Sequence, residues 1–250
     1  MKRLLMVFTV LLGILCVQTT HATTITLFQD NFNNSTIDGT KWTTDITDTT
    51  YGSIVIEANT AKFTISSLPN TPNNVYLLSN TFSISQWDRI DFSGQWKIPS
   101  AVNPEYDIFV YNADDPSKYL QVSYQSYTGA PSLPLDANLW LRDVGTTTYK
   151  DTDPRVPPQS MTDFSLWFTG TTWGYTESGF SESFASTTLA NAENFYIKIG
   201  GHVNFPYPDQ NVYFDNITVE AVATPLPPAA LLLVSGLGGL VMVRRKRTAN

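Results

Sequence analysis

Short strand-like segments recur along almost the whole middle of the chain, and this pattern constrains the fold more than any other feature. Apolar and polar residues alternate in SIVIE at 53, NVYLLS at 74 and FYIKIGG at 195. Such alternation turns one face of a strand toward a core. Similar segments begin at residues 61, 89, 107, 119, 164 and 212. Turn residues separate the segments, and no sustained 3.6-residue rhythm indicates a helix. The chain is therefore predicted to be all-β.

The number of strands indicates how they are packed. Ten or more short strands in a chain of 250 residues are typical of two antiparallel sheets that bury one face against each other. The sequence has no fixed-period repeat, which a propeller or solenoid requires. We therefore predict one antiparallel β-sandwich of jelly-roll type over residues 23–222, with the irregular stretch 129–160 forming long loops.

The N-terminus has the features of a secretory signal. Two basic residues precede an apolar run over residues 4–17, and Thr20 and Ala22 supply the small residues that signal peptidase requires. We interpret residues 1–22 as a signal peptide. Because Cys16, the only cysteine, lies within it, the mature domain is expected to have no disulfide, cysteine-bound zinc or cysteine nucleophile.

Charge is unevenly distributed along the chain. Of the 15 Lys and Arg, two lie in the signal and four near the C-terminus, which leaves 9 against all 22 Asp and Glu, a net charge of −13 for the middle. So acidic a domain is a poor partner for nucleic acid or anionic lipid, whose phosphates require clustered cations. Neutral glycans, cationic partners and divalent metals remain as candidates.

An apolar run near the C-terminus is followed by a basic end. Residues 226–243 hold 18 residues without a charge, followed by Arg244, Arg245, Lys246 and Arg247. Eighteen residues is the lower limit for crossing a bilayer core of about 30 Å. The cations favour the cytoplasmic side. We predict a transmembrane helix over residues 226–243, with the domain exported.

The order of a proline motif, an apolar helix and a basic end over residues 223–250 resembles the PEP-CTERM sorting signal. Pro225 and Pro227 match its two prolines, while Leu226 stands where Glu is usual, which makes the tail a P-L-P variant. The resemblance implies that a membrane-embedded exosortase recognises the motif and cuts near it. The protein would then be held transiently in the inner membrane of a Gram-negative bacterium and sorted to the cell surface or exopolysaccharide matrix.

The two ends of the domain also resemble a known fold. LFQDNFNNSTIDGTKWTTD at 27 and VYFDNITVE at 212 resemble the first and last strands of concanavalin-like, or laminin-G-like, jelly-roll domains. In these domains the two strands lie side by side, often with a structural calcium. The resemblance makes Asp30 and Asp215 candidate calcium ligands, aided by Asn31, backbone carbonyls and water. The alternative is two carboxylates that are each satisfied locally.

Catalytic constellations are incomplete in this sequence. Glycosidases of this sandwich type carry three carboxylates at alternating positions of one strand, as nucleophile, orienter and acid. Glu105 and Asp107 have this spacing, but Phe109 occupies the third position, so the pair is interpreted as a strand-edge feature. His202, interpreted as a surface or turn residue, is the only histidine outside the signal, and it cannot build a zinc site or a supported Ser-His-Asp triad alone. We predict that the chain is not an enzyme.

Aromatic residues favour a binding role, because sugar rings stack on flat side chains. Trp96 and Trp167 lie in strongly apolar strands and are assigned to the core. The candidate carbohydrate-binding residues, for each of which a core position remains the alternative, are Tyr124, Tyr127, Trp140, Trp173 and Tyr175. We thus expect an exported surface or matrix protein that binds extracellular polysaccharide. A glycan-active hydrolase or lyase on the same fold, or a purely structural surface protein, remains the alternative.

Overall fold

In the computed structural model, residues Ile25–Ala221 form one compact unit. The predicted signal peptide, the Pro225–Pro227 motif and the predicted transmembrane helix fall outside the residues that the structure describes. Within the described part of the chain, no helix has the length and apolar character needed to cross a membrane. The structure describes residues 23–67, 71–84, 87–99, 105–126, 137–145, 148–154, 156–204 and 207–222.

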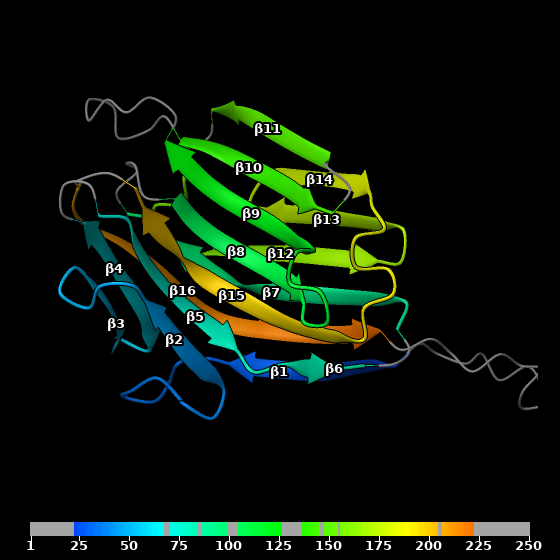
Figure 1. Cartoon of the computed structure of the whole chain (residues 1–250), viewed down its shortest axis with the longest axis horizontal. Helices are drawn as coiled ribbons and strands as arrows, with labels where there is room; N and C mark the ends of the chain where they lie inside the picture. Colours follow the sequence, from blue (N-terminus) through cyan, green and yellow to red (C-terminus); the bar gives the residue numbers. More distant parts are fainter. Residues whose placement is uncertain are drawn as a thin grey trace, which may run out of the picture. The chain divides into compact units, whose positions relative to one another are not determined.

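The described residues form sixteen strands in two sheets (Figure 1). The β7 sheet has the order β14 (Phe180–Ala185), β13 (Thr172–Glu177), β12 (Thr162–Thr169), β7 (Arg89–Lys97), β16 (Tyr207–Val222), β4 (Thr60–Ser67) and β3 (Gly52–Glu57), and β1 (Thr24–Asp30) pairs with β16. The β8 sheet has the order β11 (Thr148–Pro154), β10 (Ala137–Val144), β9 (Tyr119–Ser126), β8 (Glu105–Asn112), β15 (Asn194–Val203), β5 (Asn73–Ser79) and β2 (Trp42–Ile46), and β6 (Phe82–Ser83) pairs with β15.

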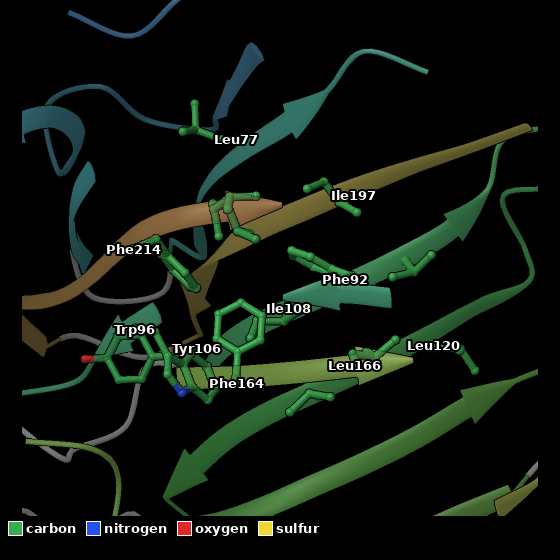
Figure 2. Packing of buried hydrophobic residues seen from close by; sticks show 14 of the residues in the cluster. Leu77, Phe92, Trp96, Tyr106, Ile108, Leu120, Phe164, Leu166, Ile197 and Phe214 are labelled. Atoms are coloured by element: carbon green, nitrogen blue, oxygen red, sulfur yellow. The ribbon is translucent and has the colours of Figure 1, made fainter. Parts of the chain in front are cut away.

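The hydrophobic core lies between the two sheets. Ile108 and Ile197 of the β8 sheet meet Phe92 and Leu166 of the β7 sheet (Figure 2), and all four are at most 1% exposed. Alternation explains this, since every second residue of β7 is buried. Full burial of each such side chain contributes about 1.5–3 kcal/mol. The predicted all-β antiparallel sandwich is confirmed.

One predicted loop region is instead largely strand. The stretch 129–160 contains β10 and β11, and β10 pairs with β9 without interruption along its length. Leu139 and Leu141 point into the core and are at most 1% exposed. The prediction of long loops is therefore wrong for residues 137–144 and 148–154, because pairing with a neighbouring strand stabilises a segment whose own alternation is weak.

Candidate active site

A carboxylate pair lies on the face of the β8 sheet that is turned away from the core, which we call the outer face. Along β8, Tyr106 and Ile108 point into the core, so Glu105 and Asp107 point the other way. Both are buried, with 5% and 0% of their surface exposed. Strand β8 lies between β9 and β15 (Figure 1). The interpretation of the pair as a strand-edge feature is therefore wrong.

A glycine opens the space beside Asp107. Gly200 of β15 lies opposite Asp107 on one side and opposite Tyr76 of β5 on the other. It has a φ of +144°, and a Cβ there would lie 2.2 Å from the carbonyl oxygen of Val75. Because no side chain intervenes, the hydroxyl of Tyr76 donates a hydrogen bond of 2.6 Å to Oδ2 of Asp107.

Neighbouring strands hold the two carboxylates by hydrogen bonds. The side-chain amide of Gln121 on β9 donates to Oδ1 of Asp107 at 2.8 Å and to Oε1 of Glu105 at 3.0 Å. The same oxygen of Glu105 accepts from Oγ of Ser123 at 2.8 Å and from Nη1 of Arg142 at 3.2 Å. Oε1 of Glu105 is thus engaged by three donors, while Oε2 faces a different neighbour.

That neighbour is His202, which lies directly opposite Glu105 on β15. Its Nε2 is 3.5 Å from Oε2 of Glu105, and its Nδ1 is 3.0 Å from the hydroxyl of Tyr76 and 3.3 Å from Oδ2 of Asp107. Its side chain is 24% exposed. The interpretation of His202 as a residue of a turn or a simple surface position is wrong, because the sheet register brings it against both carboxylates.

The electrostatics of this cluster shift several pKa values. Burial raises the pKa of Glu105, and the negative charge of Asp107 raises it further, against the opposing effects of His202, Ser123 and Arg142. Glu105 therefore keeps its proton up to a higher pH than an ordinary glutamic acid does. Burial and the charge of Asp107 also raise the pKa of the phenol of Tyr76, which therefore remains a hydrogen-bond donor.

The pKa of His202 is raised as well. Burial, the largest effect, lowers it, but the hydrogen bond to Asp107 and the charges of Asp107 and Glu105 together outweigh burial and the opposing charge of Arg142. The ring is consequently protonated over a wider pH range than a free histidine.

A row of aromatic rings continues along the outer face from the carboxylates. Tyr111 lies two residues beyond Phe109 on β8 and is flanked by Tyr119 of β9 and Tyr196 of β15. The centroid of the Tyr111 ring lies 4.8 Å from those of Tyr119 and Tyr196, and the rings of Tyr111 and Tyr196 are parallel within 5°. The three tyrosines are half-buried. Sequence reasoning missed this row, although Phe109 and Tyr111 continue the alternation of Glu105 and Asp107.

Three of the predicted sugar-stacking residues are in the core. Tyr124, Trp173 and Tyr175 are at most 1% exposed, and the hydroxyl of Tyr124 donates to Oε2 of Glu177 at 2.6 Å across the sandwich. A ring enclosed between two sheets cannot stack on a sugar, so the expectation is corrected for these three. The prediction that Trp96 belongs to the core is confirmed by its exposure of 0%.

The remaining aromatic candidates have different outcomes. Trp140 lies opposite Ser123 on the outer face, with the guanidinium of Arg142 4.8 Å from its ring centroid, and it is 7% exposed. Tyr127 is outside the described residues. Trp167, predicted to be in the core, is half-buried, with the guanidinium of Arg89 4.6 Å from its ring.

The first and last strands of the domain pair as expected, but the calcium ligands remain a prediction. Asp30 accepts hydrogen bonds from the backbone N–H of Phe32 at 3.0 Å and the indole of Trp42 at 2.7 Å. Burial, together with the charge of Asp30, raises the pKa of Asp215, against a hydrogen bond from the backbone of Asn216. The described residues hold no group of three or more His, Cys, Asp or Glu suited to a metal ion. The pair could supply two of the six to eight oxygens that calcium needs.

The fold resembles several solved structures, although no family model and no curated protein sequence matches the chain. A GlcNAcα1-4Gal-releasing endo-β-galactosidase of Clostridium perfringens is 11% identical with a TM-score of 0.60, over 82% of this chain and 63% of that one. The catalytic domain of a laminarinase of Thermotoga petrophila is 10% identical with a TM-score of 0.59, over 82% and 100%. The chain has the jelly-roll fold of these endo-glycanases. A glycoside hydrolase family 16 endo-glucanase of Bacteroides ovatus is 14% identical with a TM-score of 0.55, over 77% and 99%.

These matches correct the expectation that the chain is not an enzyme. The solved structures share its jelly-roll fold over 77% to 82% of its length, and all three are glycan hydrolases by name. The third carboxylate is missing from β8, but Glu105 and Asp107 are buried beside His202. The chain spans less than two thirds of the length of the endo-β-galactosidase.

Proposed function

We propose that the chain is an endo-acting glycan hydrolase and that Glu105 is its nucleophile. The observation that carries this proposal is the buried pair of Glu105 and Asp107 on the outer face of a central strand, held by donors from β5, β9 and β10. Fixed carboxylates in a partly dehydrated site are what glycoside cleavage requires, because they stabilise the positive charge that develops at the anomeric carbon.

The hydrogen bonds favour Glu105 over Asp107 as the attacking group. Asp107 is fully enclosed, with Oδ1 bonded by Gln121 and Oδ2 by Tyr76. Glu105 has three donors on one oxygen, and its second oxygen is turned toward the partly exposed His202. Oε2 of Glu105 is therefore the atom that attacks the anomeric carbon, while Asp107 keeps the surrounding side chains in place.

The proposed substrate is a β-linked polysaccharide such as a glucan or a galactan. The row of Tyr111, Tyr119 and Tyr196, which lies beyond Phe109 from the carboxylates on the same face, offers partly exposed aromatic surface to a bound polysaccharide. The names of the similar solved structures support the same class, since they act on β-1,3-glucan or on β-galactosidic bonds. Trp140 with Arg142 extends the same face on the other side of Ser123.

The proposed place of action is outside the cell. The signal-like residues 1–22, the Pro225-Leu226-Pro227 motif and the basic end from Arg244 support export, transient membrane attachment and release by an exosortase at the surface of a Gram-negative bacterium. An extracellular polysaccharide matrix would then be both the location and the substrate. The intact mass of the surface-released protein tests this, and a mass that still includes Arg247 refutes the cleavage.

The function is tested with the full chain on a panel of purified polysaccharides. Laminarin, mixed-linkage β-glucan, β-galactan and α-linked starch are incubated with the protein, and new reducing ends are measured with chain length by gel filtration. We expect reducing ends and rapid shortening with one of the β-linked polymers and none with starch. Glu105→Gln should abolish release, whereas the control Asp163→Asn, on the outer side of β12 and hydrogen-bonded only to Gln95 among the described residues, should not.

Two results would overturn the proposal. Binding of a polysaccharide to both wild type and Glu105→Gln without reducing ends would make the outer face a binding surface. Equal loss of activity in Glu105→Gln and Asp163→Asn would show that the measured activity does not belong to this site.

A further inference from the structure

The proposed hydrolysis lacks an obvious source of one proton. When the glycosidic bond breaks, the leaving oxygen needs a proton from a neighbouring acid. On β8 the alternate position after Asp107 is Phe109, which has no proton to give. If the site cleaves sugars, another element must supply the acid.

Chemistry narrows the choice among the described side chains of the outer face near Glu105. The guanidinium of Arg142 does not give up its proton in proteins. The phenol of Tyr76 has a strongly raised pKa and already donates its proton to Asp107. His202 is the neighbour whose ordinary pKa allows it to give and regain a proton near neutral pH.

The position of His202 is suited to this exchange. Its side chain is 24% exposed, whereas those of Glu105 and Asp107 beside it are 6% and 0% exposed, so of the three it has the most access to a bound sugar. Nε2 lies 3.5 Å from Oε2 of Glu105, the atom assigned above to attack. In an in-line displacement the leaving oxygen lies on the far side of the anomeric carbon from Oε2, so the imidazole ring has to turn from Oε2 toward that oxygen to deliver its proton.

The neighbours of the ring favour its charged form. Because Tyr76 gives its proton to Asp107, its oxygen accepts from Nδ1–H of His202 at 3.0 Å. Nε2 faces the carboxylate oxygen Oε2 of Glu105 at 3.5 Å, which favours a hydrogen on this nitrogen as well. Among the described side chains, the charged or titratable groups around the ring are Glu105 and Asp107 from β8, Tyr76 from β5 and Arg142 from β10, while β9 contributes the neutral side chains of Gln121 and Ser123.

We propose that His202 is the proton donor of this site, in place of the absent third carboxylate; the proposal rests on the hydrolase function above. Oε2 of Glu105 forms a bond to the anomeric carbon as the bond to the leaving oxygen breaks, and the Nε2 proton passes to that oxygen. Neutral His202 then takes a proton from water as the water oxygen bonds to the anomeric carbon. The Glu105 carboxylate leaves, and histidine and carboxylate return to their starting states.

Two substrates separate this proposal from the hydrolase function. A natural β-glucan needs a proton on its leaving oxygen, whereas a 2,4-dinitrophenyl β-glycoside releases a stable anion without one. We expect His202→Ala to lower kcat/KM on the polysaccharide by about 10²–10⁴-fold. The kcat/KM of the dinitrophenyl glycoside, which reports only the step that releases dinitrophenol, should change by less than about tenfold. We also expect added imidazole to restore part of the polysaccharide activity.

The wild-type pH profile gives a readout that needs no variant. If His202 is the acid, kcat/KM on the polysaccharide falls at high pH as the ring loses its proton, and this limb is absent with the dinitrophenyl glycoside. Equal loss of kcat/KM on both substrates in a folded His202→Ala variant, or the same high-pH limb of kcat/KM on both, would overturn the role. A wild-type protein that turns over neither substrate would instead overturn the hydrolase function itself.

Discussion

The substitution Glu105→Gln separates a catalytic from a structural role for the buried cluster. The amide has nearly the shape of the carboxylate and still offers an oxygen to Gln121 and Ser123, which lie 3.0 and 2.8 Å from Oε1. What is lost is the negative charge, and with it the nucleophile and the ion pair to Arg142 at 3.2 Å.

The expected effect on stability is small because two contributions oppose each other. Loss of the ion pair costs at most about 1 kcal/mol, since the Arg142 side chain is 26% exposed and partly screened. On the other side, the raised pKa of Glu105 means that its ionised form destabilises the folded state, and each unit of pKa corresponds to about 1.36 kcal/mol. We expect the free energy of unfolding at neutral pH to change by no more than about 1 kcal/mol.

Activity should respond very differently. Removing the nucleophile is expected to lower kcat by about 10⁴-fold or more, which corresponds to about 5.5 kcal/mol of transition-state stabilisation. Urea unfolding and reducing-end release measure the two quantities on the same preparation. A loss of stability of about 3 kcal/mol or more, with activity that falls only as far as the folded fraction does, would refute the reasoning and make the cluster structural.

Three further outcomes follow. Gly200→Ala places a Cβ 2.2 Å from a backbone oxygen at a positive φ, so the free energy of unfolding measured with urea should fall by about 2 kcal/mol or more. Gly39→Ala, with open space around it, should change this free energy little, and equal effects of the two substitutions would contradict the reasoning. Because the pKa of His202 is raised from 6.5, its contribution to the free energy of unfolding is complete below pH 6.5 and is lost as pH rises through the raised pKa. His202→Gln should therefore flatten the dependence of stability on pH in this range, and an unchanged slope would contradict the assigned pKa shift. If calcium binds at Asp30 and Asp215, saturation at 100 times Kd should add about 2.7 kcal/mol and raise the melting temperature, and identical melting with a chelator would exclude the site.

The alternation of residues predicted the fold well and the site poorly. Strands such as β7 and β15 were predictable because their core-facing and outward-facing positions alternate regularly. Alternation does not say which side of a strand faces the core when both sides carry aromatic rings, as in β9, where Tyr119 lies on the outer face and Tyr124 in the core. For the same reason, alternation alone did not identify the outer face of β8, with Glu105 and Tyr111, as a candidate site.

The residues that contact the two carboxylates are set by the register in which the strands pair, and this register cannot be read from a single sequence. His202 contacts Asp107 although 95 positions separate them in the chain. The signal that could have found the site was the spacing of Glu105 and Asp107, which the sequence did contain. Phe109 breaks the expected triplet, and a single sequence does not show that another strand brings a titratable side chain beside the pair.

Trapping the sugar on the protein tests the central claim most directly. A 2-deoxy-2-fluoro glycoside with a dinitrophenyl leaving group needs no acid to react, and its glycosyl-enzyme intermediate breaks down slowly. The account predicts that the full chain gains the mass of one sugar unit and that fragmentation places it on Glu105. An adduct on another residue, or release of dinitrophenol and reducing ends by a folded Glu105→Gln variant at the wild-type rate, would contradict it.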